Sequence, residues 1–250
     1  NWEVPVFGHI PLIHGADGAK LSKRHGALGV EAYRDMGYLP EALRNHLLRL
    51  GWSHGDDEVI STEQAIEWFD VDGLGKSPSR FDFKKLDSVN GHYIRHSEDR
   101  MLLDLALPGL SAAAGRDLQD IDLERLQAAM PALKERAKTI PELVENAMFL
   151  TDQRPLSIDE KSAASLTDEA VLLLAEINTS LAALESWTRE TVEACIRQFA
   201  EERELKFGAI AQPVRAALTG RAKTPGIFDA LMILGRDERL ARIADIRGKQ

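Results

Sequence analysis

The sequence predicts a mainly α-helical protein that begins with a short strand and a glycine-rich loop. Three observations predict this fold class. Apolar residues recur at helical spacing over most of the chain after about residue 98. Ser, Thr and Pro stand at positions typical of helix starts. Only the opening segment VPVFGHIPLI is typical of a strand, and prolines interrupt it.

The first elements can be placed from their terminal residues. Residues 4–13 predict a short apolar strand that leads into the loop. Pro40 suits the first turn of a helix, where its missing N–H is not needed, and Gly51 predicts where that helix stops. Ser61 and Gln64 have the spacing of a capping box, which predicts another helix after Ser61.

The second half of the sequence predicts consecutive helices without an intervening strand. Residues 167–184 form one long helix candidate. Residues 152–163, DQRPLSIDEKSA, are polar and contain a proline, which indicates a connection between two helical bundles. A later apolar stripe at helical offsets is expected to pack in a core, so its cysteine is interpreted as a packing residue: Val192, Cys195, Ile196 and Phe199.

Composition limits the class of protein. The 250 residues are 44% hydrophobic and 28% charged, and no apolar run approaches the ~20 residues of a membrane-spanning helix. We therefore expect two or three domains and no membrane contact. Cys195 is the single cysteine, so we expect no disulfide, no zinc or other metal site, and a cytoplasmic location. The chain starts at Asn1 without a signal-peptide pattern and is interpreted as a fragment of a longer protein.

The charge pattern indicates a polyanionic partner. The formal net charge of −9 argues against indiscriminate binding to nucleic acid. Three basic islands nevertheless occur, within residues 18–30, 76–95 and 205–228. Together they predict placed contacts, although a solvated face is an alternative explanation for any one of them.

The loop GADGAKLSKRHG, residues 15–26, holds three glycines, two lysines and an arginine. Such a loop can lay Lys20 and Lys23 along a triphosphate and offset the charge that develops as pyrophosphate leaves. Its glycine-to-lysine spacing is not that of a Walker loop. A solvent-exposed basic turn is the alternative.

Longer strings carry a resemblance to a known family. PVFGHIPLIHGADGAKLSKRHG resembles the strand and signature loop of class I aminoacyl-tRNA synthetases, with KLSKR where the family writes KMSKS. Two further segments resemble the stem-contact region of bacterial glutamyl-tRNA synthetases: YRDMGYLPEALRNHLLRLGWSHG and KSPSRFDFKKLDSVNGHYIR. Two segments later in the chain resemble the anticodon-binding helical bundles of the same enzymes: KERAKTIPEL and QPVRAALTGRAKTPGIFDALMILGRDERLARI. The similarity covers nearly all of the chain, with one departure: Ser88 stands where the family often has an aromatic residue.

The resemblance implies a C-terminal portion of such an enzyme, from the signature loop onward. Residues 1–30 would be a remnant of the class I nucleotide-binding fold with its loop, and residues 31–98 a small α/β stem-contact domain. Residues 99–155 and 156–250 would form two α-helical anticodon-binding subdomains.

In the family, the signature loop closes over ATP, which is bound with magnesium, while glutamate is activated as its adenylate. By that match Lys20 and Lys23 are the predicted catalytic residues, and Ser22 and Arg24 complete the ATP-binding set, with His25 a weaker candidate. A plain surface position is the alternative for Arg24.

The helical part would read the anticodon. Arginine can pair bidentately with the edge of a splayed base, so Arg136 and Arg215 are the predicted readers. Thr224 precedes Pro225 and predicts a helix start whose N–H groups could receive a base or phosphate oxygen. The alternatives are an intrahelical ion pair for Arg136 and simple capping for Thr224.

The implied function is glutamate–tRNA ligation. The partners would be glutamate and ATP in the full-length enzyme and tRNA(Glu), with a monomer expected. The family's His-x-Gly-His signature is absent from these residues, so we expect the chain alone to bind tRNA without charging it.

Two other functions are compatible with this sequence, and two are disfavoured. An enzyme that also charges tRNA(Gln) is the near alternative, and a helical protein-interaction scaffold is the distant one. Glutaminyl-tRNA synthetase is disfavoured because its family reads the anticodon with β-barrels. The short paralogue that modifies a tRNA base lacks the C-terminal bundles.

Overall fold

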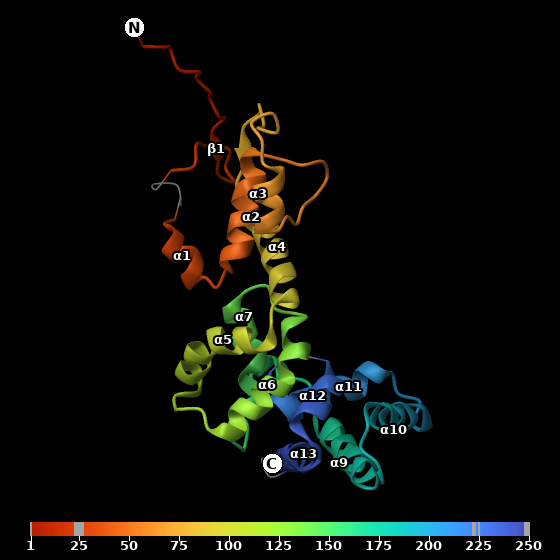
Figure 1. The fold of residues 1–250 in the computed structure, drawn as a ribbon. Helices are drawn as coiled ribbons and strands as arrows, with labels where there is room; N and C mark the ends of the chain where they lie inside the picture. The colour runs from red at the N-terminus through yellow and green to blue at the C-terminus, as the bar shows by residue number, and fades with distance from the viewer. Residues whose placement is uncertain (1, 23–27, 222–223, 225, 248–250) are drawn as a thin grey trace. The chain divides into compact units, whose positions relative to one another are not determined.

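The computed structural model describes residues 2–22, 28–221, 224 and 226–247. The chain divides into two compact units: unit 1 comprises Asn1–Ser97 and Ala137–Pro141, and unit 2 comprises Glu98–Arg136 and Glu142–Gln250. Helices dominate both units, and the two described strands both lie in unit 1 (Figure 1). The predicted fold class is therefore confirmed. The finer division into four domains stays a prediction.

Unit 1 combines a two-stranded parallel sheet with four helices. Strand β1 (Ile13–His14) pairs with β2 (Ser79–Arg80), so that Ile13 lies opposite Ser79 and His14 opposite Arg80. The helices are α1 (Val30–Asp35), α2 (Pro40–Gly51), α3 (Thr62–Trp68) and α4 (Phe83–His96). Helices α2 and α4 pack against each other. Four buried apolar residues form a core cluster in this unit: Tyr33, Leu43, Phe81 and Leu86.

Local signals explain where these helices begin. Pro40 occupies the start of α2 and Gly51 ends it, as predicted. Ser61 Oγ accepts a hydrogen bond from Gln64 N at 3.1 Å, and Gln64 Oε1 accepts one from Ser61 N at 3.0 Å. The predicted capping box is therefore confirmed at the start of α3.

A short segment later in the sequence, Ala137–Pro141, also belongs to unit 1. Asn90 is fully buried in α4; its Oδ1 accepts from Leu39 N at 2.8 Å, and its Nδ2 donates to the carbonyl oxygen of Lys138. Ile140 N donates to Gly37 O at 3.1 Å. Gly37 has φ of +81°, which favours glycine, and the backbone of residues 140–141 lies against it.

The opening strand prediction was largely wrong. Regular strand pairing is confined to Ile13–His14, and the apolar side chains before it are exposed: Val4, Val6, Phe7 and Ile10. Pro5 and Pro11 remove two backbone donors. Within the described chain the segment has no neighbouring strand edge with which to pair.

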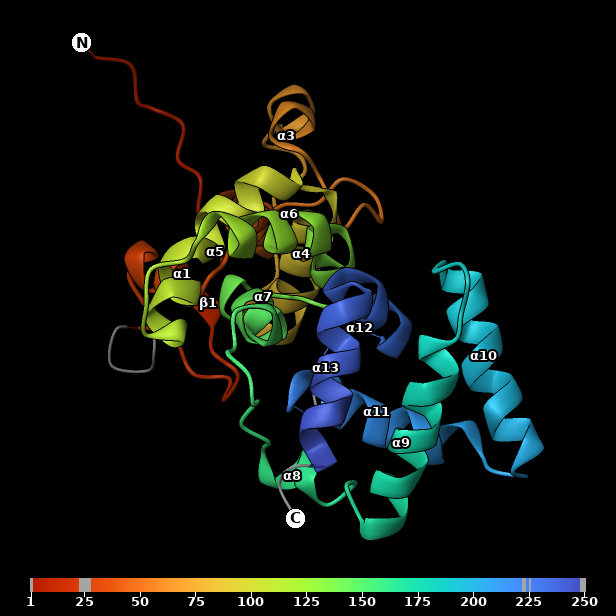
Figure 2. The same ribbon diagram turned by 90° about the horizontal axis from the view of Figure 1, so that it is seen from below.

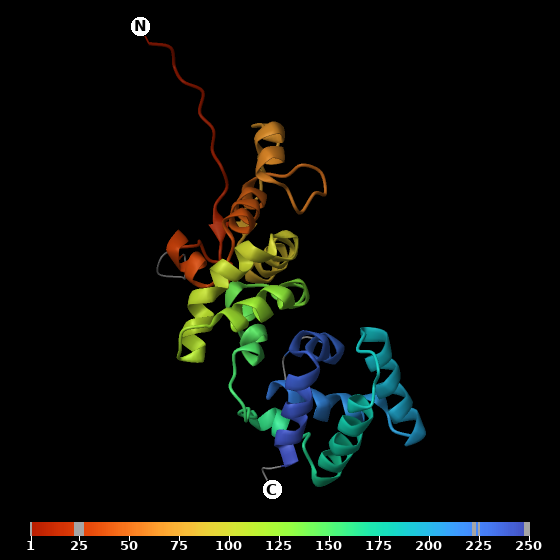
Figure 3. The same ribbon diagram turned by 60° about the horizontal axis from the view of Figure 1, so that its bottom comes forward.

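Unit 2 is helical in its described residues (Figures 2 and 3). Its elements are α5 (Asp99–Ala114), α6 (Asp120–Lys134), α7 (Ile140–Ala147) apart from its first two residues, the 3-10 helix η2 (Met148–Leu150), α8 (Glu160–Ala163), α9 (Asp168–Ala182), α10 (Arg189–Glu202), α11 (Phe207–Thr219), α12 (Ile227–Leu234) and α13 (Arg236–Arg247). Helix α9 packs against α10 and α13, and α11 contacts α9, α12 and α13. None of the described helices is long and apolar enough to cross a membrane.

The sequence signals of unit 2 mostly match this arrangement. Thr167 caps α9 by accepting a hydrogen bond from Ala170 N at 3.2 Å. Three members of the predicted stripe are buried: Val192, Ile196 and Phe199. Cys195 is half-buried, and burial raises the pKa of its thiol, which fits a packing residue better than a nucleophile.

Candidate nucleic-acid interface

The glycine-rich segment after β1 folds as a tight turn. Leu21 N donates to Ile13 O at 2.9 Å, and Gly15 N donates to Ala19 O at 2.9 Å. Asp17 Oδ1 accepts from Ala19 N at 3.0 Å, while Gly18 adopts a φ of +79° that suits glycine. These bonds order the backbone on the approach to the KLSKR string.

The structure places only part of the predicted ATP-binding set. Lys20 is exposed and forms no ion pair with any described residue. Ser22 is half-buried two positions later. Lys23, Arg24 and His25 lie outside the described residues.

Two predicted anticodon residues come together in unit 2. Arg136 follows α6 and is exposed, whereas Arg215 lies in α11 and is half-buried. Burial, and then the positive charge of Arg136, lowers the pKa of Arg215, so the two guanidinium groups are close enough to repel each other. Arg136 forms no ion pair with a described acid, so the alternative of an intrahelical pair is not seen.

The prediction that a helix starts at Thr224 was wrong, because the helix begins further along the chain. Helix α12 begins at Ile227, and its N-cap is Gly226, whose extended backbone (φ −53°, ψ 148°) precedes the first helical residue. Thr224 therefore lies upstream of the cap and is buried. Gly226, two residues after Thr224, is the described residue near Arg136: Arg136 Nη2 lies 3.9 Å from where a Cβ on Gly226 would be.

A cavity of about 280 Å³ lies beside Arg215, between α8 and α11. Its wall includes Lys161, Ser162, Gln212 and Arg221. Among the described residues, Arg215 Nε and Ser162 Oγ are buried without a hydrogen-bond partner. Unpaired buried donors next to cations suit a ligand with planar acceptors or phosphate oxygens.

Sequence reasoning missed part of this wall. Lys161 and Ser162 fall in the polar segment that was interpreted only as a connection, and Gln212 had no distinguishing signal. Arg221 lies in a basic island of the sequence, but it pairs with Asp152 at 3.0 Å, so its charge is already compensated.

Comparison with known proteins decides the family. A family model described as "Anticodon binding domain" matches residues 101–247, and one described as "tRNA synthetases class I (E and Q), catalytic domain" matches residues 1–88. The chain is 57% identical over 249 residues to glutamate–tRNA ligase 2 of Paramagnetospirillum magneticum, covering 99% of this chain and 52% of that protein. This chain belongs to the glutamyl-tRNA synthetase family of class I aminoacyl-tRNA synthetases.

Other members of the glutamyl-tRNA synthetase family support the same assignment. Glutamate–tRNA ligase 2 of Zymomonas mobilis is 56% identical over 246 residues, which is 98% of this chain and 51% of that protein. A crystal structure of a glutamate tRNA ligase from Elizabethkingia meningosepticum superposes with a TM-score of 0.80 at 28% identity, covering 99% of this chain and 52% of that one. The chain spans about half the length of the curated relatives that it matches.

Proposed function

We propose that the protein to which this chain belongs activates glutamate with ATP and transfers it to tRNA(Glu). The chain supplies the signature loop and the part that holds the tRNA. One observation carries this proposal: the uncompensated Arg136 and Arg215 lie close together inside the segment that matches the anticodon-binding model. Two cations held together without an acid favour a polyanionic or acceptor-rich partner.

In this proposal the loop serves the ATP step. Lys20 and Lys23 neutralise the triphosphate as pyrophosphate leaves, while Ser22 and Arg24 complete the ATP site. The exposed, unpaired ammonium group of Lys20 fits this task, because it can turn towards phosphate oxygens without breaking an ion pair with a described residue. Magnesium bound to ATP supplies further charge neutralisation on the phosphates.

The helical unit reads the anticodon. Arg215 and Arg136 offer planar guanidinium groups that can pair with base edges splayed out of the loop. Thr224 completes the proposed anticodon set, because Gly226, two residues later, lies near Arg136. The enzyme is proposed to act as a cytoplasmic monomer.

A filter-binding assay tests the proposal on this chain. Transcripts of tRNA(Glu) and tRNA(Gln) are titrated at 50 and 200 mM salt. We expect tRNA(Glu) binding that weakens steeply with salt, because neutralised phosphates release counterions. Binding without salt dependence, or none at all, would favour the helical interaction scaffold instead. Equal affinity for tRNA(Gln) would favour the enzyme that charges both tRNAs.

A second measurement concerns catalysis. The 250-residue chain is expected to bind tRNA without catalysing ATP–pyrophosphate exchange, because the His-x-Gly-His signature is absent from its sequence. An exchange rate equal to that of a full-length family member would contradict this part of the proposal.

A further inference from the structure

One acidic residue lies next to a predicted anticodon reader. Asp229 stands in the first turn of α12, and its Oδ2 is 2.8 Å from the position that a Cβ on Gly226 would occupy. Arg136 Nη2 lies 3.9 Å from the same position. Because Gly226 has no side chain, it places no atom of its own between this carboxylate oxygen and the guanidinium group.

The carboxylate of Asp229 is nevertheless not paired with Arg136. Among the described residues its ion pair is with Arg189 of α10, whose Nη1 donates to Oδ1 at 2.5 Å. That hydrogen bond is the largest cause of a raised pKa of Arg189. Helix α12 packs against both α10 and α6, and Arg136 follows α6. The fold therefore brings two arginines from different helices to one acid, and only one of them holds it.

Arg189 determines which oxygen of Asp229 is left for a ligand. A guanidinium group only donates, so Arg189 occupies Oδ1, while Oδ2 has no hydrogen-bond partner among the described residues. The side chains of Arg189 and Asp229 are 51% and 27% exposed, so a ligand can reach them. A donor, Arg136 Nη2, and an acceptor, Asp229 Oδ2, are therefore available beside each other.

A donor beside an acceptor matches the edge of particular bases. Cytosine carries an amino group, which donates, where uracil carries a carbonyl oxygen, which accepts. A carboxylate is a typical acceptor for the amino group of cytosine, and it repels the carbonyl oxygen of uracil. Bases splayed out of a single-stranded loop expose these edges to protein side chains.

We propose that Asp229 is a specificity-determining residue of the anticodon site, where it selects cytosine over uracil at one anticodon position. Arg136 donates to the same base. Arg189 is a positioning residue: it holds the carboxylate and prevents it from pairing with Arg136, which would withdraw that guanidinium group from the base. The inference rests on the proposed function, because it requires this site to hold the anticodon.

The test uses the 250-residue chain and transcripts of tRNA(Glu) that carry cytosine or uracil at each anticodon position in turn. Filter binding at one fixed salt concentration gives the ratio of the two dissociation constants at each position. Asp229→Asn keeps the shape of the side chain. Because Arg189 has only donors, the amide oxygen must face it, which turns the amide NH2 group towards the base.

We expect the parent chain to prefer cytosine by roughly tenfold at one position, as for a paired base contact. Asp229→Asn should abolish or invert that preference, because its NH2 group donates to the carbonyl oxygen of uracil. Asp104→Asn is the matched control, since it removes the same charge from an exposed pair with Arg100, and its ratio should stay within about twofold of the parent.

Arg189→Ala tests the positioning role. The released carboxylate should pair with Arg136, which weakens binding of every transcript by about two- to fivefold and lowers the cytosine preference. Adding Asp229→Ala should restore affinity but not the preference. Arg100→Ala, with the same loss of charge, should change neither. Circular dichroism confirms that each variant is folded, and the ratio in Arg189→Ala decides the outcome if Asp229→Asn does not fold.

A cytosine preference that persists in folded Asp229→Asn would overturn the inference. So would a parent chain that binds tRNA(Glu) without distinguishing cytosine from uracil at any anticodon position. Both outcomes leave the proposed function standing, because tRNA is still bound. A parent chain that binds no tRNA would contradict the proposed function and this inference together.

Discussion

The guanidinium group of Arg242 donates a hydrogen bond from Nη1 to the backbone carbonyl oxygen of Phe149, 93 residues earlier, at 2.7 Å. The same nitrogen donates to Leu218 O at 2.8 Å, and Nε donates to Glu238 Oε1 at 2.7 Å. Arg242 is 1% exposed, and burial lowers its pKa. This side chain thereby joins η2, α11 and α13 across the polar connection of residues 152–163.

Replacing Arg242 by Met should lower the free energy of unfolding by about 3 kcal/mol. The change leaves two buried carbonyl groups without their donor and Glu238 without its cation. Urea unfolding followed by circular dichroism measures the effect. Arg100→Met is the control, because the exposed pair of Arg100 with Asp104 is expected to contribute less than about 0.5 kcal/mol. Equal losses in the two variants would show that Arg242 has no special role.

The stability of unit 2 should depend on pH through Asp122. Arg116 donates to both carboxylate oxygens, at 2.6 and 3.1 Å, and Gln119 N donates at 2.9 Å. The hydrogen bond from Arg116 is the largest cause of a pKa below the ordinary value of 3.8. The stabilisation is therefore present above about pH 4 and is lost as the pH falls through the lower folded pKa.

Asp122→Asn tests this dependence by urea unfolding at pH 7, 5 and 3. The variant should be less stable than the parent by about 2 kcal/mol at pH 7, and the difference should shrink at pH 3. Asp104→Asn, at an exposed pair, should change little at any of these pH values. A difference that stays constant from pH 7 to pH 3 would contradict the assignment.

Gly37→Ala should destabilise unit 1 by roughly 2–4 kcal/mol, because a positive φ and a steric clash add together. At φ of +81°, a Cβ would lie 2.2 Å from Pro141 Cδ and 2.8 Å from Ile140 N. Gly55→Ala is the matched control: its φ is +52°, but no atom lies within 4 Å of the added Cβ. We expect only the smaller, conformational cost of about 1–2 kcal/mol in the control. Equal melting temperatures for the two variants would rule out the clash.

Arg215→Ala should weaken tRNA(Glu) binding by about 1–3 kcal/mol if the guanidinium group reads a base. Arg215→Lys keeps the charge and should recover affinity without recovering anticodon preference, because it lacks the planar fork. Arg203→Ala removes the same charge from the outer face of unit 2, where Arg203 pairs with Glu176, and should change binding little. Filter binding with anticodon variants of the tRNA measures all three. An unchanged dissociation constant and preference in Arg215→Ala would remove this residue from the site.

Local chemistry made several elements predictable from the sequence. The Ser61 and Gln64 pair and Thr167 each make a hydrogen bond within one turn, so their effect can be deduced without knowing the rest of the fold. The opening strand failed for the opposite reason, since a strand requires a partner edge. Pro108 and Pro131 lie inside α5 and α6, where packing outweighs the lost hydrogen bond.

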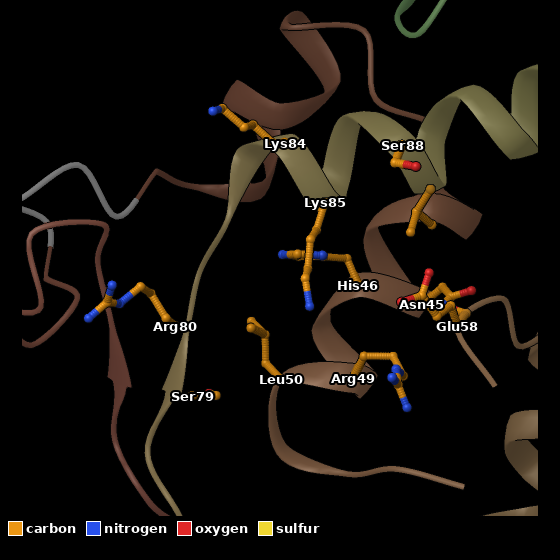
Figure 4. Close-up of a pocket in the computed structure, with 11 residues that line it drawn as sticks. Asn45, His46, Arg49, Leu50, Glu58, Ser79, Arg80, Lys84, Lys85 and Ser88 are labelled. Atoms are coloured by element: carbon orange, nitrogen blue, oxygen red, sulfur yellow. The ribbon is translucent and has the colours of Figure 1, made fainter. Parts of the chain in front are cut away.

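The candidate site residues show the same contrast between local and long-range determinants. The resemblance predicts Lys20, Arg136 and Arg215 as site residues one by one, but their surroundings depend on long-range contacts. No sequence pattern predicts that Arg49 and Arg80, 31 positions apart, line one hollow of unit 1 between α2, β2 and α4 (Figure 4).

The five-residue return of the chain at Ala137–Pro141 determines how this protein can be divided experimentally. A truncated polypeptide ending at Ser97 would contain every helix and strand wholly assigned to unit 1, yet it would lack the Lys138 carbonyl oxygen that accepts from the buried Asn90 amide. It would also lose the donor to Gly37 O, the N–H of Ile140. A peptide of the missing residues, added in trans, should therefore raise the melting temperature of such a truncated protein.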